Sequence, residues 1–509
     1  MFMPTATVEP GSSLLAGYRL PQAGVLRTVP VHSLPPEAVR VGHNVWLHQG
    51  ALRARPGMVA DASAASYGAV ANGAALGSFL YVSKSNVKMP VVATESAIAQ
   101  LEADGIWRSL ATITATRAQP VRFTALENNQ QVSLLAASAD IGLLHKTESA
   151  AGFTAITLPE GLAASRIVDI ATAATRIVLA QPPYTIAWSN SLQPTVYQDT
   201  SQLILADTED RLVAIKQLGT LGFVIYKEGS IYLGIAQSGA DAFAFKPEFY
   251  GEAEGPCGPQ AIVSINNVHY YMTPSGRVGI FTGTQQAFIA DGLWPFLQDD
   301  LDRQYIKHVN ACFDYQLNTV FFFYPRKGDN GACHGLVTLN LPYPTAGIAQ
   351  HASFTGLTHL DITNALSVRL FDATQKPFLF ATDLAPTTQK VLRLDKEVLT
   401  DDNGLFDCVV QPGLTPSPQA MIYKPYIELQ AHRGEDHGVV NIYQVTSNLL
   451  ETADGTVEDK ETLLDLTIVT PAQYLGFTTA ATFLGFRLEW LSDQNLIYYG
   501  CDMYGRPTA

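Results

Sequence analysis

The side chains that could carry chemistry in this chain are scattered, and none of them forms a compact catalytic motif. The most acidic stretch in the middle of the chain is residues 299–302 (Asp-Asp-Leu-Asp), and residues 401–404 read Asp-Asp-Asn-Gly. Paired carboxylates can act as acid and base in glycoside hydrolysis, and alternating oxygen ligands can hold Ca²⁺. Residues 401–404 lack the terminal bidentate Glu of a calcium loop. We interpret the first stretch as a solvated loop and the second as part of a linker.

Histidines and cysteines show no metal-binding spacing either. The chain has 11 histidines and 5 cysteines, with no Cys-x-x-Cys pair. His269 falls in a strand-like run, VHYYM, where we expect it to pack against aromatic rings. There is no Gly-x-Ser-x-Gly elbow, Walker loop or His-Glu-x-x-His. We therefore predict no catalytic residue, no metal site and no cofactor, and we predict that the protein is not an enzyme.

The elements that would position these side chains are strands. Short runs rich in Val, Ile, Phe and Tyr are broken by Gly, Asn, Asp and Pro, which is the pattern of an all-β chain. A strand–turn–strand unit recurs about seven times, and its starts lie 44 to 58 residues apart, the length of a four-stranded propeller blade. The units begin at Phe79, Val132, Arg176, Phe223, Val268, Val320 and Phe378.

These repeats predict an all-β fold: a β-propeller core of about six or seven degenerate blades, with an additional antiparallel β-module at the C-terminus. We expect residues 1–60 to form an extended docking arm and first strands, residues 61–400 the propeller, residues 401–420 a linker, and residues 421–509 the C-terminal module or a sheet that closes the propeller. Stacked β-sandwich domains are the alternative, because they also give short strands with frequent turns.

Charge and hydropathy narrow the classes of function. The net charge is −14, charged residues make up only 15% of the chain, and the mean hydropathy is +0.09. A protein with a large negative net charge is a poor candidate for binding the phosphate backbone of nucleic acids. The low fraction of charged residues indicates surfaces that contact other subunits. No run approaches the ~18 apolar residues of a membrane span, and the first residues lack a signal-peptide pattern. We expect the protein to be made and kept in a cytoplasm.

Three stretches resemble one protein family. The segment VGHNVWLHQGALRARPG at residues 41–57 is similar to the opening of the nozzle (tail tubular) proteins of short-tailed bacteriophages. Two further similarities are FVIYKEGSIYLG, followed by the run from Gly255 to Gly283, and the closing hairpin from Phe483, which ends in Gly505-Arg506. The opening match rests on Asn44, Trp46, Gly50, Leu52, Arg53, Arg55, Pro56 and Gly57.

The resemblance implies a structural virion protein of the phage tail. In that family a β-propeller with added β-domains assembles as a homohexameric nozzle below the tail adaptor ring and portal. The ring extends the channel for viral genome ejection, and DNA passes through its lumen without specific binding. The resemblance thus places the protein in the virion, assembled in the host cytoplasm, with tail fibres as possible further partners. Residues 1–60 carry five Arg and two Glu, a net charge of +3, and in this basic arm Arg53 and Arg55 are candidate contacts to the adaptor.

Two alternatives remain open at this point. A fibre-docking hub or a genome-stabilising tail plug would have the same architecture. A propeller glycosidase or lectin belongs to a different class, and it predicts a monomer with a carboxylate-rich central pocket.

Overall fold

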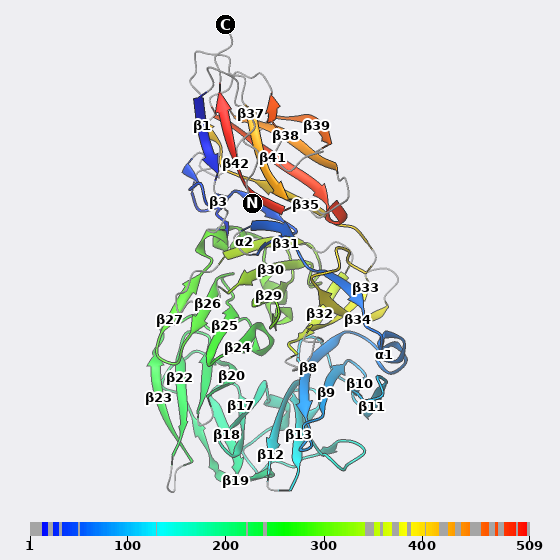
Figure 1. Ribbon diagram of the computed structural model, residues 1–509. Coiled ribbons are helices and arrows are strands. Elements are labelled where there is room, and N and C mark those ends of the chain that lie inside the picture. The colour runs from blue at the N-terminus through cyan, green and yellow to red at the C-terminus, as the bar shows by residue number, and fades with distance from the viewer. Residues whose placement is uncertain are drawn as a thin grey trace.

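Almost all regular structure in this chain is β-strand. The computed structural model describes residues 13–18, 24–29, 33–48, 51–128, 130–219, 222–237, 242–341, 351–356, 360–368, 376–383, 388–402, 404–416, 426–432, 439–447, 460–467, 474–476, 483–494 and 497–505. Seven four-stranded sheets surround a common axis in Figure 1, and two six-stranded sheets form a second domain above them. In the described part of the chain, no helix is long and apolar enough to cross a membrane.

The seven sheets are the blades of a β-propeller, as the repeats predict. Each of the first six blades uses four consecutive strands joined antiparallel. They are β8 (Ala75–Val82), β9 (Lys88–Thr94), β10 (Ala97–Leu101) and β11 (Trp107–Thr112); β12 (Arg122–Glu127), β13 (Val132–Ser138), β14 (Gly142–Thr147) and β15 (Thr154–Ala155); β16 (Asp169–Ala173), β17 (Arg176–Gln181), β18 (Thr185–Asn190) and β19 (Gln193–Ile204); β20 (Leu212–Leu218), β21 (Gly222–Lys227), β22 (Ile231–Ala236) and β23 (Phe243–Phe249); β24 (Ile262–Ile265), β25 (Val268–Met272), β26 (Val278–Phe281) and β27 (Gln286–Ile289); and β28 (Asn310–Asp314), β29 (Thr319–Tyr324), β30 (Gly335–Asn340) and β31 (His351–Gly356).

The seventh blade joins the two ends of the propeller. Its strands are β32 (Leu360–Leu366), β33 (Phe378–Asp383) and β34 (Gln389–Asp395), and its outermost strand is β7 (Gly57–Ala60) from the N-terminal part of the chain. β7 runs antiparallel to β34, with Asp395 opposite Gly57. The first strands of successive blades contact one another round the axis, and β32 contacts β8. The ring is therefore closed.

The repeating units found in the sequence correspond to definite strands. From Val132 onward, each unit covers the second and third strands of a blade, and the first unit covers β8 and β9. The second strand is the most regular part of a blade because neighbouring blades cover both of its faces. In β29, for example, Phe321, Phe322, Phe323 and Tyr324 are all at most 1% exposed. A strand buried on both faces loses the alternation of apolar and polar residues, and this aromatic run is core, as expected.

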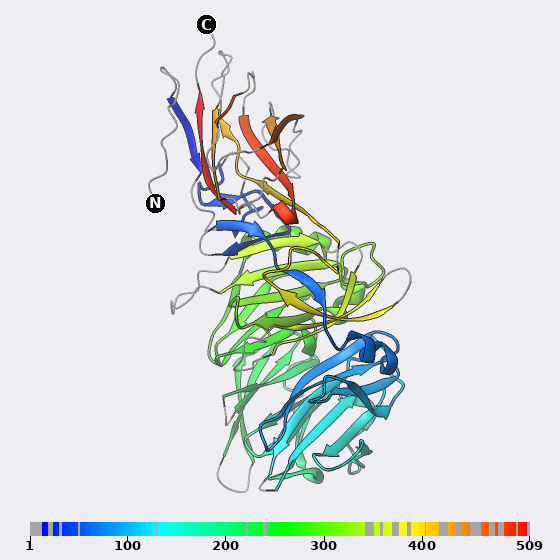
Figure 2. The same ribbon diagram turned by 45° about the vertical axis from the view of Figure 1, so that its right-hand side comes forward.

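The second domain combines both ends of the chain in two packed sheets. One sheet has the order β40 (Tyr474–Gly476), β37 (Tyr426–His432), β42 (Ile497–Gly505), β6 (Ala51–Ala54) and β5 (Val45–His48), with β1 (Ser13–Tyr18) also on β42. The other has the order β39 (Lys460–Thr467), β38 (Val439–Ser447), β41 (Phe483–Leu491), β35 (Asp407–Gln411) and β4 (Val41–His43), with β36 (Thr415–Pro416) on β41. Figure 2 shows β1 lying beside β42 near the end of this domain.

Two domain boundaries differ from the sequence expectation. Within the described residues, the first 60 residues give β1 and β4–β6 to the second domain and β7 to the propeller, so they do not form a separate arm. Residues 401–420, expected to be a linker, contain β35, which lies between β41 and β4. The physical reason is the same for both segments. Each supplies a strand whose partner is far away in the sequence, and local composition does not show such a pairing.

One hydrophobic core runs through both domains. A single cluster contains Val45 and Leu52 of the second domain, Leu488 of its facing sheet, and Phe313 and Val320 of the sixth blade. The outer strand of that blade, β31, contacts β4, β5 and the short strand β2 (Gly24–Val25), which pairs in parallel with β3 (Ala38–Val39). The second domain therefore packs on the rim of the propeller beside the sixth blade (Figure 1).

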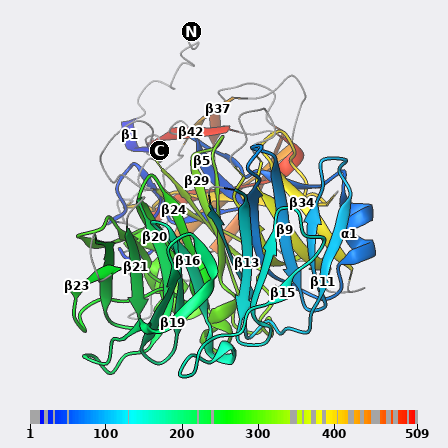
Figure 3. The same ribbon diagram turned by 90° about the horizontal axis from the view of Figure 1, so that it is seen from below.

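The two α-helices are short. Seen from below, helix α1 (Ala64–Val70) lies at the outer edge beside β11 and β34, which it contacts (Figure 3). It follows β7 directly, and its buried Tyr67 packs against Trp107 and Phe380. Helix α2 (Trp294–Asp300) follows the fifth blade. In place of the solvated loop expected at residues 299–302, Asp300 accepts hydrogen bonds from Tyr324 and Arg326.

A substitution at the closing strand tests how tightly the ring is sealed. A Cβ on Gly57 would lie 2.3 Å from the carbonyl oxygen of Thr400 and 2.6 Å from that of Val398, and backbone atoms cannot move aside. We expect Gly57→Ala to lower the free energy of unfolding by at least about 2 kcal/mol, measured by urea denaturation. Gly68→Ala is the matched control, because a Cβ on this exposed helical glycine meets nothing, and a gain of up to about 1 kcal/mol is expected. If Gly57→Ala and Gly68→Ala changed the free energy of unfolding equally, the close approach of Gly57 to the backbone of Val398 and Thr400 would be contradicted.

Candidate functional site

Three concave surfaces of the described residues are lined by the inner strands of the propeller and by loops next to them. A pocket of about 340 Å³ is formed by the loops that lead into the inner strands of the second to sixth blades and by turns between the second and third strands of the third to fifth blades. Beyond it lie two adjoining cavities of about 350 and 550 Å³, lined mainly by the inner strands themselves. The pocket and the first cavity share Pro259. We call the pocket the mouth and the two cavities the channel.

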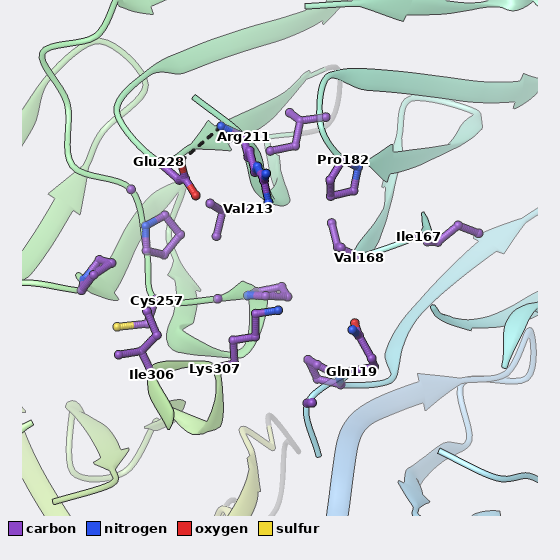
Figure 4. A pocket seen from close by; sticks show the side chains of 18 residues that line it. Gln119, Ile167, Val168, Pro182, Arg211, Val213, Glu228, Cys257, Ile306 and Lys307 are labelled. Carbon is purple, nitrogen blue, oxygen red and sulfur yellow. Dashed lines mark hydrogen bonds between the residues drawn. The ribbon is translucent and has the colours of Figure 1, made fainter. Parts of the chain in front are cut away.

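The mouth is rigid and mostly apolar. Five prolines line it, and proline fixes the backbone of the loops that carry it. In Figure 4, Arg211 and Glu228 stand at one edge and Lys307 at the opposite edge. The backbone N–H of Arg211 donates to Glu228 Oε2 at 3.4 Å. Burial raises the pKa of the Cys257 thiol well above its usual range, so this cysteine is not a nucleophile at neutral pH.

The channel is organised around Arg122, Asp169 and Lys216. These residues come from β12, β16 and β20, the inner strands of three successive blades. Arg122 Nε donates to Asp169 Oδ1 at 3.0 Å. Asp169 is fully buried, and it also accepts the backbone N–H groups of Ile170 and Ile215, each at 3.0 Å. One carboxylate therefore ties three blades together and neutralises the guanidinium beside it.

Lys216 is the cation near this network that Asp169 does not bind. Arg122 and Lys216 both line the two channel cavities, together with Phe79, Ser264 and Tyr315. Among the described residues, Lys216 has no hydrogen-bond acceptor and no ion-pair partner. The pKa of Lys216 is lowered to about 8, first by burial and then by the positive charge of Arg122, while Asp169 opposes both effects. A half-buried amine held beside a second cation is a perturbed group of the kind that marks functional sites.

His269 has a structural role, as expected from its strand. It is fully buried in β25, and its ring lies 5.9 Å from that of Tyr226. Nε2 lies 2.9 Å from the carbonyl oxygen of Gln217, so it is the donor, and Nδ1 accepts from the hydroxyl of Tyr226 at 2.8 Å. Burial lowers the pKa of His269 to about 4. The ring stays neutral at physiological pH and acts as a fixed bridge between blades.

The two arginines expected to contact an adaptor have different surroundings. Arg55 is 1% exposed, and its Nη1 donates to Asp401 Oδ1 at 2.9 Å while Nη2 bonds the other carboxylate oxygen. Its Nε donates to the side chain of Asn44 at 3.1 Å, and its guanidinium stacks on Phe406. Arg55 is therefore not available for a surface contact, which corrects the expectation for this residue. Arg53 is half-buried, with its guanidinium 4.9 Å from the ring centre of Trp46, and its adaptor contact stays a prediction.

The channel residues could not be found from local motifs. Arg122 and Asp169 are 47 residues apart, and Asp169 and the N–H of Ile215 are 46 apart. Only the closure of blades round an axis brings such positions together. Among the described residues, no group of three or more His, Cys, Asp or Glu side chains could hold a metal ion.

The chain matches no protein-family model and no curated protein sequence. Among solved structures it is similar to YCF48 bound to a D1 peptide (10% identity, 67% of this chain and 98% of that chain, TM-score 0.38). It is also similar to a chain of the mitotic checkpoint complex, with 11% identity over 67% of this chain and 90% of that chain and a TM-score of 0.41. A third similar structure is virginiamycin B lyase from Staphylococcus aureus, with 10% identity over 63% of this chain and 94% of that chain and a TM-score of 0.38. At this distance only the arrangement of strands is shared.

The buried pair of Arg55 and Asp401 gives a stability prediction. Arg55→Met leaves a buried carboxylate without its partner, and we expect a loss of about 3–5 kcal/mol in the free energy of unfolding. The double variant Arg55→Met/Asp401→Leu removes both charges and should recover part of this loss. Arg53→Met is the matched control, with an expected cost of about 1 kcal/mol or less. Urea denaturation distinguishes these results, and an equal cost for Arg53→Met and Arg55→Met would contradict the structural role of Arg55.

The titration of Lys216 gives a second prediction. Its pKa is lowered in the folded chain from 10.5 to about 8, so the unfolded state binds more protons between these values. Stability from this group therefore rises as the pH is raised from about 8 to 10.5, and Lys216→Met should remove that rise. At pH 7 the variant should be more stable than the wild type by about 1 to 3 kcal/mol. Unfolding curves at several pH values measure this, and a less stable Lys216→Met would show that Lys216 supports the fold.

Proposed function

We propose that this chain is a non-enzymatic structural subunit of a phage tail, a nozzle protein whose homohexameric ring extends the genome-ejection channel below the adaptor ring. The observation that carries the proposal is the position of the motif at residues 41–57. Asn44, Trp46, Arg55 and Gly57, four residues of this motif, lie at the joint between the two domains.

The joint is buried and interlocked. Asn44 has a φ of 51°, a conformation that asparagine tolerates better than most residues, and its amide donates to the carbonyl oxygen of Asp407 at 2.8 Å. Trp46 belongs to the second domain, but its side chain packs in the core of the sixth and seventh blades. Arg55 binds Asp401, and Gly57 begins the closing strand. A joint of this kind makes propeller and second domain one rigid body, which a ring subunit under genome pressure requires.

Charge and exposed strand edges are consistent with a ring that conducts DNA. The chain carries a net charge of −14, and no carboxylate lines the described channel cavities. The acidic groups therefore lie outside the propeller channel, where they can face a lumen shared by subunits and repel phosphate. The outermost strands of the blades, such as β19 and β23, have one unpaired edge within the described chain, and neighbouring subunits can cover such edges.

The same lining argues against a propeller glycosidase. Hydrolysis of a glycosidic bond by the usual mechanism needs two carboxyl groups within about 5–10 Å of one another. Glu228 is the single carboxylate among the residues that line the described mouth, and none lines the channel.

Assembly with an adaptor ring tests the proposal. We expect mass photometry and negative-stain images of the purified chain with a candidate adaptor to show a six-fold ring with a central channel. Arg53→Glu should weaken binding to the adaptor at least tenfold. Arg108→Glu is the matched control, because Arg108 lies on β11 and its side chain is 54% exposed. A chain that stays monomeric with the adaptor and cleaves or binds glycans would overturn the proposal.

A further inference from the structure

The channel has the opposite charge to the protein that contains it. Of the described residues that line its two cavities, Arg122 and Lys216 are charged, and no Asp or Glu is among them. Asp169 is fully buried behind the lining, and its carboxylate accepts hydrogen bonds from Arg122 and two backbone N–H groups. In a chain of net charge −14, this is a local concentration of positive charge.

The neutral side chains round these cations present hydrogen-bond donors. Asn267 Oδ1 accepts the backbone N–H of Gly219 at 3.1 Å, and Asn364 Oδ1 accepts the hydroxyl of Ser78. In each amide the oxygen is engaged, so the NH₂ group is the part left to meet a ligand. Asn267 lines the larger cavity and Asn364 the smaller one. These two NH₂ groups can donate to an oxyanion, while Asn310, which also lines the smaller cavity, has an Oδ1 acceptor without a partner among the described residues.

The space fits a small molecule rather than a single ion. The larger cavity measures about 550 Å³, within the roughly 300–1,000 Å³ of small-molecule sites. Inner strands from all seven blades contribute to the lining of the two cavities, so a molecule in the channel would be contacted on several sides. Direct contact with Lys216 and Arg122 needs one end of the molecule to be anionic.

We propose that the propeller channel binds a small molecule that carries a carboxylate or phosphate group, with Lys216 and the guanidinium of Arg122 facing the anion and the amides of Asn267 and Asn364 donating to it. Lys216 is the residue on which binding depends, because Arg122 is already paired with Asp169. The unpaired amine costs stability in the empty protein, and an anion offsets that cost when it binds. The site lies within a single chain and does not require ring assembly, so its test is independent of the nozzle proposal.

Isothermal titration calorimetry with two probes tests the site and separates its two chemistries. Pyrophosphate represents phosphate ligands and citrate represents carboxylate ligands, each titrated into the full-length protein at pH 7 and about 0.15 M salt. We expect saturable binding of at least one probe with one molecule per chain. Lys216→Met should weaken it at least tenfold, and Lys216→Arg should keep most of the affinity because it keeps the positive charge.

Lys246→Met is the matched control. The side chain of Lys246 is 62% exposed on β23, away from the channel lining, and its removal should leave the affinity unchanged. Circular dichroism and unfolding curves confirm that each variant is folded. Absence of saturable binding for both probes would overturn the proposal. Equal affinity of wild type and Lys216→Met would also overturn it, because the anion would then bind somewhere else.

Discussion

The pairing of β7 with β34 is the interaction on which the rest of the molecule depends. A propeller blade buries its faces against its neighbours, so a ring with one open seam would expose two apolar faces to water. Here the seam is closed by four residues from the N-terminal part of the chain, Gly57–Ala60. The same strand is held on its other side, where the N–H groups of Gly57 and Met58 donate to the carbonyl oxygens of Val398 and Thr400 at 2.8 Å.

Closure also fixes the second domain. The segment before β7 supplies β4, β5 and β6 to the two packed sheets of the second domain. Arg55 lies between β6 and β7, where the chain passes from the second domain to the propeller, and it binds Asp401. Because the chain passes through both domains at each end, neither domain can separate without breaking strand pairings in the other. The core that joins Leu488 to Phe313 adds a continuous apolar contact to this restraint. The channel follows from closure as well, since it is the space that seven inner strands leave at the axis.

Much of the fold was predictable from sequence, and the channel was not. The second strand of each blade is apolar on both faces, and its turn residues are local, so the units from Val132 to Phe378 were visible in the sequence. By contrast, β7 has no distinctive composition, and its partner β34 is more than 300 residues away. Arg55 illustrates the same limit. An arginine beside a turn suggested a surface contact, and only the carboxylate of Asp401, 346 residues later, explains its burial. The cluster of Arg122, Asp169 and Lys216 likewise exists only when three blades stand side by side.

Hydrogen exchange read by mass spectrometry tests the central claim, that an N-terminal strand seals the propeller and locks both domains into one body. The amides of β7 and β34 should exchange together in the slowest class, at the rate of global unfolding. In Arg55→Met, peptides from β7, β34 and β35 should all accelerate by a similar factor. If β7 instead exchanged within minutes while β34 stayed protected, the ring would be stable without its closing strand, and the account would be wrong.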